Sequence, residues 1–272
     1  MRSQLPILVT VLMLAGCASQ PREPVLRDAA GGRLAQVDMA VCSQVSVDPE
    51  RKVGKKERLA ELRMALGAGY MRKGALDVAL QELEKSLELN PRSAEAHATM
   101  ALLMLRLDKP DQAGQHYVRA LQLAPSDPEI RNNYGVYLCN QGHARAADAQ
   151  FRCAIANPLY RTPAMAYTNA AECALRHGDA PRAEIDLQTA AQIDPGYAMA
   201  SLMLADLSMD KGDAGTARRH LSRYMRHAGQ TPAGLALGVR VETALGDLDR
   251  AASYRLLLKN RFPDSREAQE LN

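Results

Sequence analysis

Cysteines are the residues of this chain best suited to chemistry, because a thiolate is a nucleophile, a metal ligand and half of a disulfide. The five stand at Cys17, Cys42, Cys139, Cys153 and Cys173. None belongs to a C-x-x-C pair, and Cys139, His143 and Cys153 lack the short paired spacing of structural zinc ligands. We therefore expect no metal site and no cofactor, which leaves disulfide formation as the chemistry to consider.

The usual catalytic patterns are missing as well. Neither G-x-S-x-G nor H-E-x-x-H occurs, and the six histidines are scattered along the chain. The glycine-rich stretch 67–74, GAGYMRKG, is preceded by no predicted strand, and Ala75 and Leu76 follow it where a phosphate-binding loop needs Lys and Ser or Thr. The sequence predicts no catalytic residue, no small-molecule substrate and no enzymatic activity.

The elements that must position these side chains are predicted to be helices. Of the 272 residues, 47% are hydrophobic, with no Trp, two Phe, many Ala and Leu, and few runs of β-branched residues. We interpret this composition as all-α. Lys and Arg exceed Asp and Glu by 34 − 31 = 3 with both signs interspersed, which does not favour a nucleic-acid partner. The basic cluster 51–58, RKVGKKER, suits either a solvated helix start or a contact with anionic lipid heads.

The N-terminus has the pattern of an export signal. The apolar run over residues 5–16 is about a dozen residues long, whereas a transmembrane helix needs roughly 20. We interpret residues 1–16 as a signal peptide. Its end, Leu14-Ala15-Gly16-Cys17, resembles the lipobox of bacterial lipoproteins, which implies cleavage before Cys17 and lipidation of that cysteine. The alternative is an ordinary secretory signal whose cysteine falls near the cleavage site by chance.

Lipidation predicts where the mature protein lies. Ala18 follows the cysteine where an Asp would, in lipoproteins of this kind, imply retention in the inner membrane. We therefore expect a lipid anchor in the outer membrane, with the protein facing the periplasm. Residues 17–50, which include Pro21, Pro24, Gly31 and Gly32, are predicted to be the lipidated N-terminus and a flexible linker. A repeat domain is expected over 51–272.

That domain repeats with a period of 34 residues. A column of small residues recurs at steps of 34, 34, 36, 34 and 34, at Gly67, Ala101, Gly135, Ala171, Ala205 and Val239. Alanines keep the same steps at Ala79, Ala113, Ala147, Ala183, Ala217 and Ala251. Turn residues lie between the columns at Gly74, Asp108, Gly142, Gly178, Gly212 and Gly246. Because two antiparallel helices approach closely only where one presents Gly or Ala, the columns predict helix pairs that cross at the small residues.

This pattern resembles the tetratricopeptide repeat family over about residues 60–266. The resemblance implies an α-solenoid that forms a right-handed superhelix with a concave groove. About six repeats are expected, near 60–93, 94–127, 128–161, 164–197, 198–231 and 232–266. A third column is large and apolar at Leu83, Tyr117, Phe151, Leu187 and Leu221, and repeats close with Pro91, Pro125, Pro158, Pro195 and Pro263. Arg255 replaces the large apolar residue in repeat six and Gly229 replaces the proline in repeat five, so these two repeats are expected to be less regular. The two extra residues in 157–164 are either a neutral loop insertion or a longer connection that widens the turn or places Tyr160 on the surface.

Solenoids of this kind usually bind a peptide or a helix in the concave groove. By analogy with the repeat family, the inward face of the first helices in repeats one and two is apolar. Its residues, our candidate partner-binding groove, include Met64, Ala68, Met71, Ala98, Leu102 and Leu105. Met and Leu at this spacing also suit a helix core, so the alternative is that they pack inside the solenoid.

An exported protein meets an oxidising compartment, where the four cysteines left after lipidation can form disulfides. Cys139 and Cys173 fall in the first helices of successive repeats, which run side by side, and we favour a Cys139–Cys173 bond. Two free buried thiols are the alternative. Cys153 is the main competing partner, and Cys42 is expected to stay unpaired.

Three longer stretches carry a second resemblance. NNYGVYLCNQG at 132–142, AIANPLYRTPAMAYTNAAEC at 154–173 and LADLSMDKGDAGTARRHLSRY at 204–224 are similar to the PilF/PilW family of type IV pilus biogenesis lipoproteins. This resemblance implies a pilotin, a non-enzymatic outer-membrane lipoprotein that binds the type IV pilus secretin subunit and promotes its localisation and oligomerisation. The alternatives are a general envelope scaffold for outer-membrane or cell-wall machinery, and a thiol oxidoreductase that uses Cys139 and Cys173.

Overall fold

The computed structural model describes Cys42 and residues 54–270, and the regular elements in this part of the chain are all α-helices. The all-α prediction is confirmed. The expected signal peptide 1–16, the lipidation site Cys17 and most of the linker lie outside the described residues. Over 54–270, no helix combines the length and the apolar content that crossing a bilayer requires.

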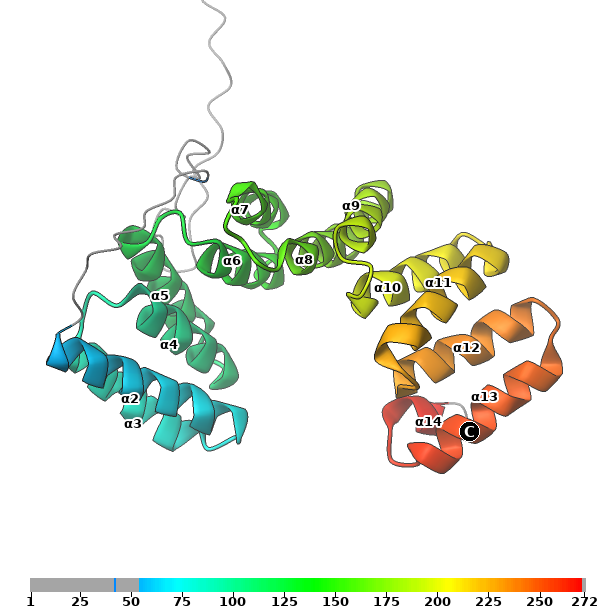
Figure 1. Ribbon diagram of the computed structural model, residues 1–272, viewed down its shortest axis with the longest axis horizontal. Helices are drawn as coiled ribbons and strands as arrows, with labels where there is room; N and C mark the ends of the chain where they lie inside the picture. The colour runs from blue at the N-terminus through cyan, green and yellow to red at the C-terminus, as the bar shows by residue number, and fades with distance from the viewer. Residues whose placement is uncertain (1–41, 43–53, 271–272) are drawn as a thin grey trace, which may run out of the picture.

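Twelve helices of the described chain form six antiparallel pairs that stack as a tetratricopeptide solenoid. The pairs are α2 (Lys55–Arg72) with α3 (Leu76–Leu89), α4 (Ala94–Arg106) with α5 (Pro110–Leu123), α6 (Pro128–Asn140) with α7 (Ala144–Ala156), α8 (Pro163–Arg176) with α9 (Ala180–Ile193), α10 (Ala198–Asp210) with α11 (Ala214–Ala228), and α12 (Pro232–Ala244) with α13 (Leu248–Arg261). Figure 1 shows the stack as an arch, with α6 and α8 on its inner side and α7 and α9 on its outer side. A short helix that the repeat pattern did not predict, α14 (Arg266–Glu270), packs on α12 and α13.

The turn inside each pair contains a residue in the left-handed region, because the chain must reverse within a few residues. The five turn glycines of the repeat pattern have φ between 76° and 82°. In repeat two Asp108 takes this position with φ 57°, a conformation that Asp tolerates better than most residues. The residues that mark the period are therefore the ones that the turns require.

The column of small residues lies where the two helices of a pair cross. A Cβ atom added to Gly135 would lie 2.6 Å from the ring of Phe151. In repeat six the residue at the crossing is Gly238, one position before the predicted Val239, and a Cβ added to it would lie 2.7 Å from the ring of Tyr254. In both cases the glycine and the aromatic residue that it meets are 16 residues apart in the sequence. Our interpretation of Arg255 as the replacement for the large apolar residue is wrong, because Tyr254 supplies that side chain one position earlier.

Gly135→Ala is expected to destabilise the fold by about 1–3 kcal/mol, because the new methyl group overlaps the rigid ring of Phe151. This cost opposes the gain in helix propensity, which is about 1 kcal/mol for Gly to Ala. Gly69→Ala in α2 is the matched control, since its Cβ would meet only the end of Arg72 at 3.9 Å. This variant should therefore stabilise the fold through its higher helix propensity. Urea denaturation measures both changes. A Gly135→Ala variant as stable as Gly69→Ala would contradict the close crossing.

The longer connection between repeats three and four is packed inward. Tyr160 is 7% exposed and contacts apolar residues of α7 and α8, so the alternative that places it on the surface is wrong. Asn157 fixes the connection, since its Nδ2 donates to the Ser126 carbonyl oxygen at 2.9 Å and its Oδ1 accepts from the Leu159 amide at 2.9 Å. The longer connection therefore packs between repeats three and four and leaves no gap between them.

Repeat two contains a pair of half-buried histidines between α4 and α5. His97 Nε2 lies 3.2 Å from the Pro91 carbonyl oxygen, which only accepts, so this hydrogen bond assigns the His97 proton to Nε2. His97 Nδ1 then accepts from His116 Nδ1, 3.1 Å away. Burial lowers the pKa of both imidazoles, and the nearby Arg119 lowers the pKa of His97 further.

Acidification below about pH 6.5 is expected to reduce the stability of the fold. Because the pKa of each histidine is lower in the folded chain than its ordinary value of 6.5, the unfolded chain binds more protons in the window between the two values. Unfolding free energy therefore rises with pH across that window. His116→Asn keeps a donor near the position of Nδ1 and removes one titrating group. Between pH 7.5 and 5 this variant should lose less unfolding free energy than the wild type, and equal losses would contradict the role of the pair.

Candidate partner-binding surfaces

Polar contacts join consecutive first helices along the inner side of the arch. Arg106 Nη1 donates to the Met71 carbonyl oxygen at 2.7 Å, Asn169 Nδ2 donates to Asn132 Oδ1 at 3.0 Å, and Arg240 pairs with Asp206 at 2.7 Å. These contacts fix the spacing between neighbouring first helices. The concave face is therefore a preformed surface, which lowers the ordering cost of binding a partner.

The six predicted groove residues come together on the adjacent helices α2 and α4. Met64, Met71, Leu102 and Leu105 are half-buried and pack against the core of repeats one to three. Ala98 is 7% exposed, and Ala68 is half-buried. Most of these side chains thus serve both the core and the surface. The surface that they leave open is apolar, although none of the six is fully exposed.

A more exposed apolar surface runs along another face of α2. It consists of Leu59, Leu62, Leu66 and Tyr70, which we name the α2 stripe. Their side chains are 43, 63, 48 and 37% exposed in that order. The spacing of three or four residues places all four on one face of the helix. None of them was among the sequence candidates.

Later repeats bury this face under the preceding second helix. Leu62, Leu66 and Tyr70 correspond in the 34-residue register to Ala96, Met100 and Met104 of α4, which are 0, 3 and 3% exposed. The helix packed against that side of α4 is α3. Since α2 is the first helix of 54–270, no second helix of the described chain precedes it. The α2 stripe is therefore the face that a helix from elsewhere would cover. The sequence alone could have identified the stripe, because the 34-residue register aligns its residues with core positions of the next repeat.

The side of α3 that meets α4 shows what kind of helix fits such a face. Two leucines and two glutamates of α3 line the hollow beside Met100 and Met104, namely Leu80, Glu84, Leu87 and Glu88. A helix with glutamates at these positions would be opposite in charge to α2, because the sequence of α2 holds five Lys or Arg and two Glu. Arg63 is neutralised by Glu82 at 2.7 Å, and hydrogen bonds from Arg63 and Lys85 lower the pKa of Glu82. The α2 stripe thus suits an amphipathic helix with acidic flanks.

Cys139 on α6 and Cys173 on α8 form a disulfide, with Cα atoms 5.8 Å apart. The bond joins the first helices of repeats three and four, at the centre of the arch (Figure 1). His177 places a ring nitrogen within 4.8 Å of both sulfur atoms. Because a disulfide sulfur is not a thiolate, these three residues are not a metal-ligand set while the bond is intact.

Cys42 forms a second disulfide with Cys153 on α7, with Cα atoms 4.9 Å apart. Our expectation that Cys42 stays unpaired is therefore wrong. Both cysteines are 1% exposed, and 111 residues separate them in the sequence. The bond fixes one point of the N-terminal region to a helix on the outer side of the arch (Figure 1).

Comparison with known proteins agrees with this fold. The tetratricopeptide repeat family matches residues 70–132. The type IV pilus assembly protein PilF of Pseudomonas aeruginosa is 28% identical over 215 residues, which are 79% of this chain and 85% of that protein. Among solved structures, the type IV pilus biogenesis factor PilW has a TM-score of 0.71 at 29% identity and covers 79% of this chain and 98% of its own. The structure of P. aeruginosa PilF has a TM-score of 0.70 at 28% identity and covers 80% and 98%.

Proposed function

We propose, from the premise that this chain is a tetratricopeptide-repeat relative of PilF and PilW, that it supports type IV pilus biogenesis as a pilotin. It is a non-enzymatic protein that binds the type IV pilus secretin subunit and promotes the localisation and assembly of that subunit in the outer membrane. The observation that carries the proposal is the agreement in sequence and structure with these two pilus proteins over 79–80% of the chain. Repeat solenoids bind other proteins through preformed faces, which suits this role.

The secretin contact belongs on the α2 stripe and the adjoining groove. An amphipathic helix of the secretin subunit, with acidic flanks, takes the place of the second helix that no described residue supplies, and its apolar face covers Leu62, Leu66 and Tyr70. Burying one such side chain fully is worth about 1.5–3 kcal/mol, so a few of them carry a usable share of the binding energy. The six groove residues, Met64, Ala68, Met71, Ala98, Leu102 and Leu105, line the concave edge of the same contact.

A lipid on Cys17 anchors the mature protein in the outer membrane, facing the periplasm. The 25 residues from Cys17 to Cys42 span at most about 90 Å when extended. Since Cys42 is bonded to Cys153, this tether is attached to α7 and not at the end of the stack. Anchoring holds the binding face close to newly delivered secretin subunits and so raises their effective concentration at that face.

Deletion of the gene, followed by immunoblotting for secretin multimers in separated inner and outer membranes, tests this function. The pilotin proposal predicts loss of the multimers or their retention in the inner membrane, restored by a plasmid copy of the wild-type gene. Normal outer-membrane multimers in the deletion strain would contradict it. Intact pili with altered cell wall or outer-membrane proteins would instead identify a general envelope scaffold.

A further inference from the structure

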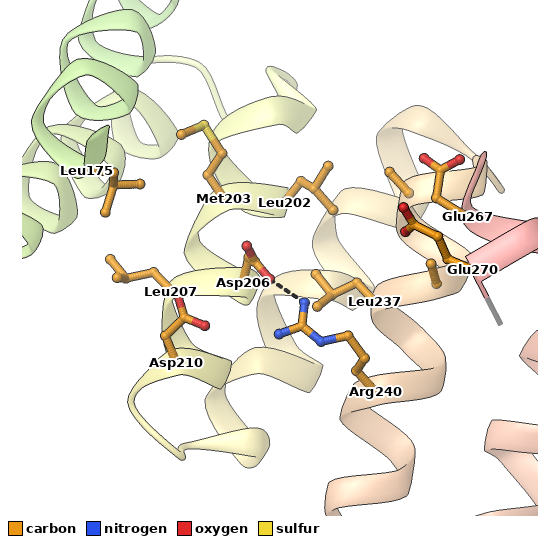
Figure 2. A pocket seen from close by; sticks show the side chains of 12 residues that line it. Leu175, Leu202, Met203, Asp206, Leu207, Asp210, Leu237, Arg240, Glu267 and Glu270 are labelled. Atoms are coloured by element: carbon orange, nitrogen blue, oxygen red, sulfur yellow. Dashed lines mark hydrogen bonds and ion pairs between the residues drawn. The ribbon is translucent and has the colours of Figure 1, made fainter. Parts of the chain in front are cut away.

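A hollow with charged residues on both rims lies far from the α2 stripe, in the concave face of the last three repeats (Figure 1). Its volume is about 370 Å³, and α8, α10, α12 and α14 all contribute to its wall (Figure 2). Most of the lining residues come from first helices, whose inward positions form the concave face. The sequence candidates lay in repeats one and two and did not include this surface.

The floor of the hollow is apolar. Leu202 and Met203 of α10 are half-buried there, beside Leu207 of α10 and Leu237 of α12, which are 6 and 5% exposed. Figure 2 shows Leu202 and Leu237 between two groups of acidic side chains. A bulky apolar side chain that enters the hollow would therefore leave water and pack against leucine and methionine side chains, which is favourable.

The rims are acidic. Four carboxylates line the hollow against one guanidinium, namely Asp206, Asp210, Glu267 and Glu270 against Arg240. Arg240 pairs with Asp206 at 2.7 Å, and Arg266 pairs with Glu270 at 2.6 Å. Among the ion pairs of residues 54–270, none involves Asp210 or Glu267, so these two carboxylates leave the hollow negative.

The placement of Asp210 is costly to the fold. It is the last residue of α10, where the helix dipole is negative and a carboxylate is unfavourable. The neighbouring Lys211 is engaged elsewhere, because its Nζ lies 2.5 Å from Glu184. A residue that breaks a local preference without a compensating contact points to selection for something other than stability.

We propose that this hollow is a second protein-binding site, which takes a short peptide segment with a bulky apolar side chain flanked by Lys or Arg. The apolar side chain enters between Leu202 and Leu237, and the basic side chains pair with Asp210 on one rim and Glu267 on the other. Asp210 is exposed and Glu267 is half-buried, so both carboxylates can be reached by a segment laid along the surface. The site is opposite in charge to the basic α2 helix, and it does not depend on the secretin assignment.

Selection of random 12-residue peptides on phage against the purified mature chain tests this proposal. The selected peptides should be enriched in Lys or Arg within a few residues of Leu, Ile, Phe or Met. Fluorescence anisotropy should then show at least tenfold weaker binding of a selected peptide to Asp210→Lys/Glu267→Lys. The neutral variant Asp210→Asn/Glu267→Gln keeps the side-chain shapes and should weaken binding at least threefold. Raised salt should weaken binding to the wild type.

Asp77→Lys/Asp111→Lys is the matched control, since it changes net charge equally at exposed positions on α3 and α5. This variant should bind the peptide within twofold of the wild type. Peptides without basic enrichment, or equal binding to all variants, would overturn the proposal. A dimer of the chain in analytical ultracentrifugation that Asp210→Lys/Glu267→Lys dissociates would also overturn it, because a second copy would then occupy the hollow.

Discussion

Replacing Leu62 and Leu66 by glutamate is expected to abolish secretin multimers in the outer membrane while the chain stays folded. Both side chains are about half exposed or more, at 63 and 48%, so the charges do not enter the core. The same charges would be buried by a helix that covers the α2 stripe, and burying an unpaired carboxylate is strongly unfavourable. Immunoblots of separated membranes from a deletion strain that carries the variant measure the effect.

The matched control for this variant is Ile185→Glu/Leu256→Glu. These residues lie on the second helices α9 and α13 and are 59 and 61% exposed, so the chemical change is the same on another face. The control should restore normal multimers. Circular dichroism of both purified variants checks that the helices are intact. Normal multimers with Leu62→Glu/Leu66→Glu would mean that the secretin does not use the α2 stripe.

Removal of the Cys139–Cys173 bond is expected to lower the stability of the fold strongly. Cys139→Ala/Cys173→Ala should lower the unfolding free energy by about 3–4 kcal/mol, because the bond closes a loop of 34 residues and so restricts the unfolded chain. Alanine avoids burying a hydroxyl at positions that are only 7 and 5% exposed. Urea unfolding under non-reducing conditions measures the difference between the variant and the wild type.

Reduction of the wild type with dithiothreitol provides the comparison. Since reduction also breaks Cys42–Cys153, it should destabilise the wild type more than the double alanine substitution does. The same reductant should destabilise the variant only through the remaining bond. A variant that unfolds at the wild-type urea concentration would show that the Cys139–Cys173 bond does not constrain the unfolded state.

The fold was predictable because each repeat needs the same few residues at the same places. Glycine in the turns, and Gly or Ala where the helices cross, are steric requirements that no other residue types meet equally well. Gly135 against Phe151 and the turn at Gly142 show the two requirements within one repeat. A period of 34 residues makes such a requirement visible without structural information.

Features that depend on contacts between distant residues were not predictable in this way. The partner of Cys42 is 111 residues away and outside the repeat register, so spacing gave no reason to pair it. Tyr254 replaces Arg255 in packing through a shift of one residue, which a column fixed at 34 residues misses. The hollow near Asp210 depends on α14, a helix without a counterpart in the other repeats of the described chain. The α2 stripe is different, because the register aligns it with core positions of α4, and the structure adds that residues 54–270 supply no second helix before α2 to cover it.

Site-specific photocrosslinking in living cells tests the central claim most directly. A benzoylphenylalanine introduced at Leu62 should, after illumination, give an adduct that antibodies to both this chain and the secretin subunit recognise. The same residue introduced at Ile185, which is also well exposed, should give no such adduct. An adduct at Leu62 that lacks the secretin, or a secretin adduct at Ile185 alone, would contradict the claim that the α2 stripe binds the secretin subunit.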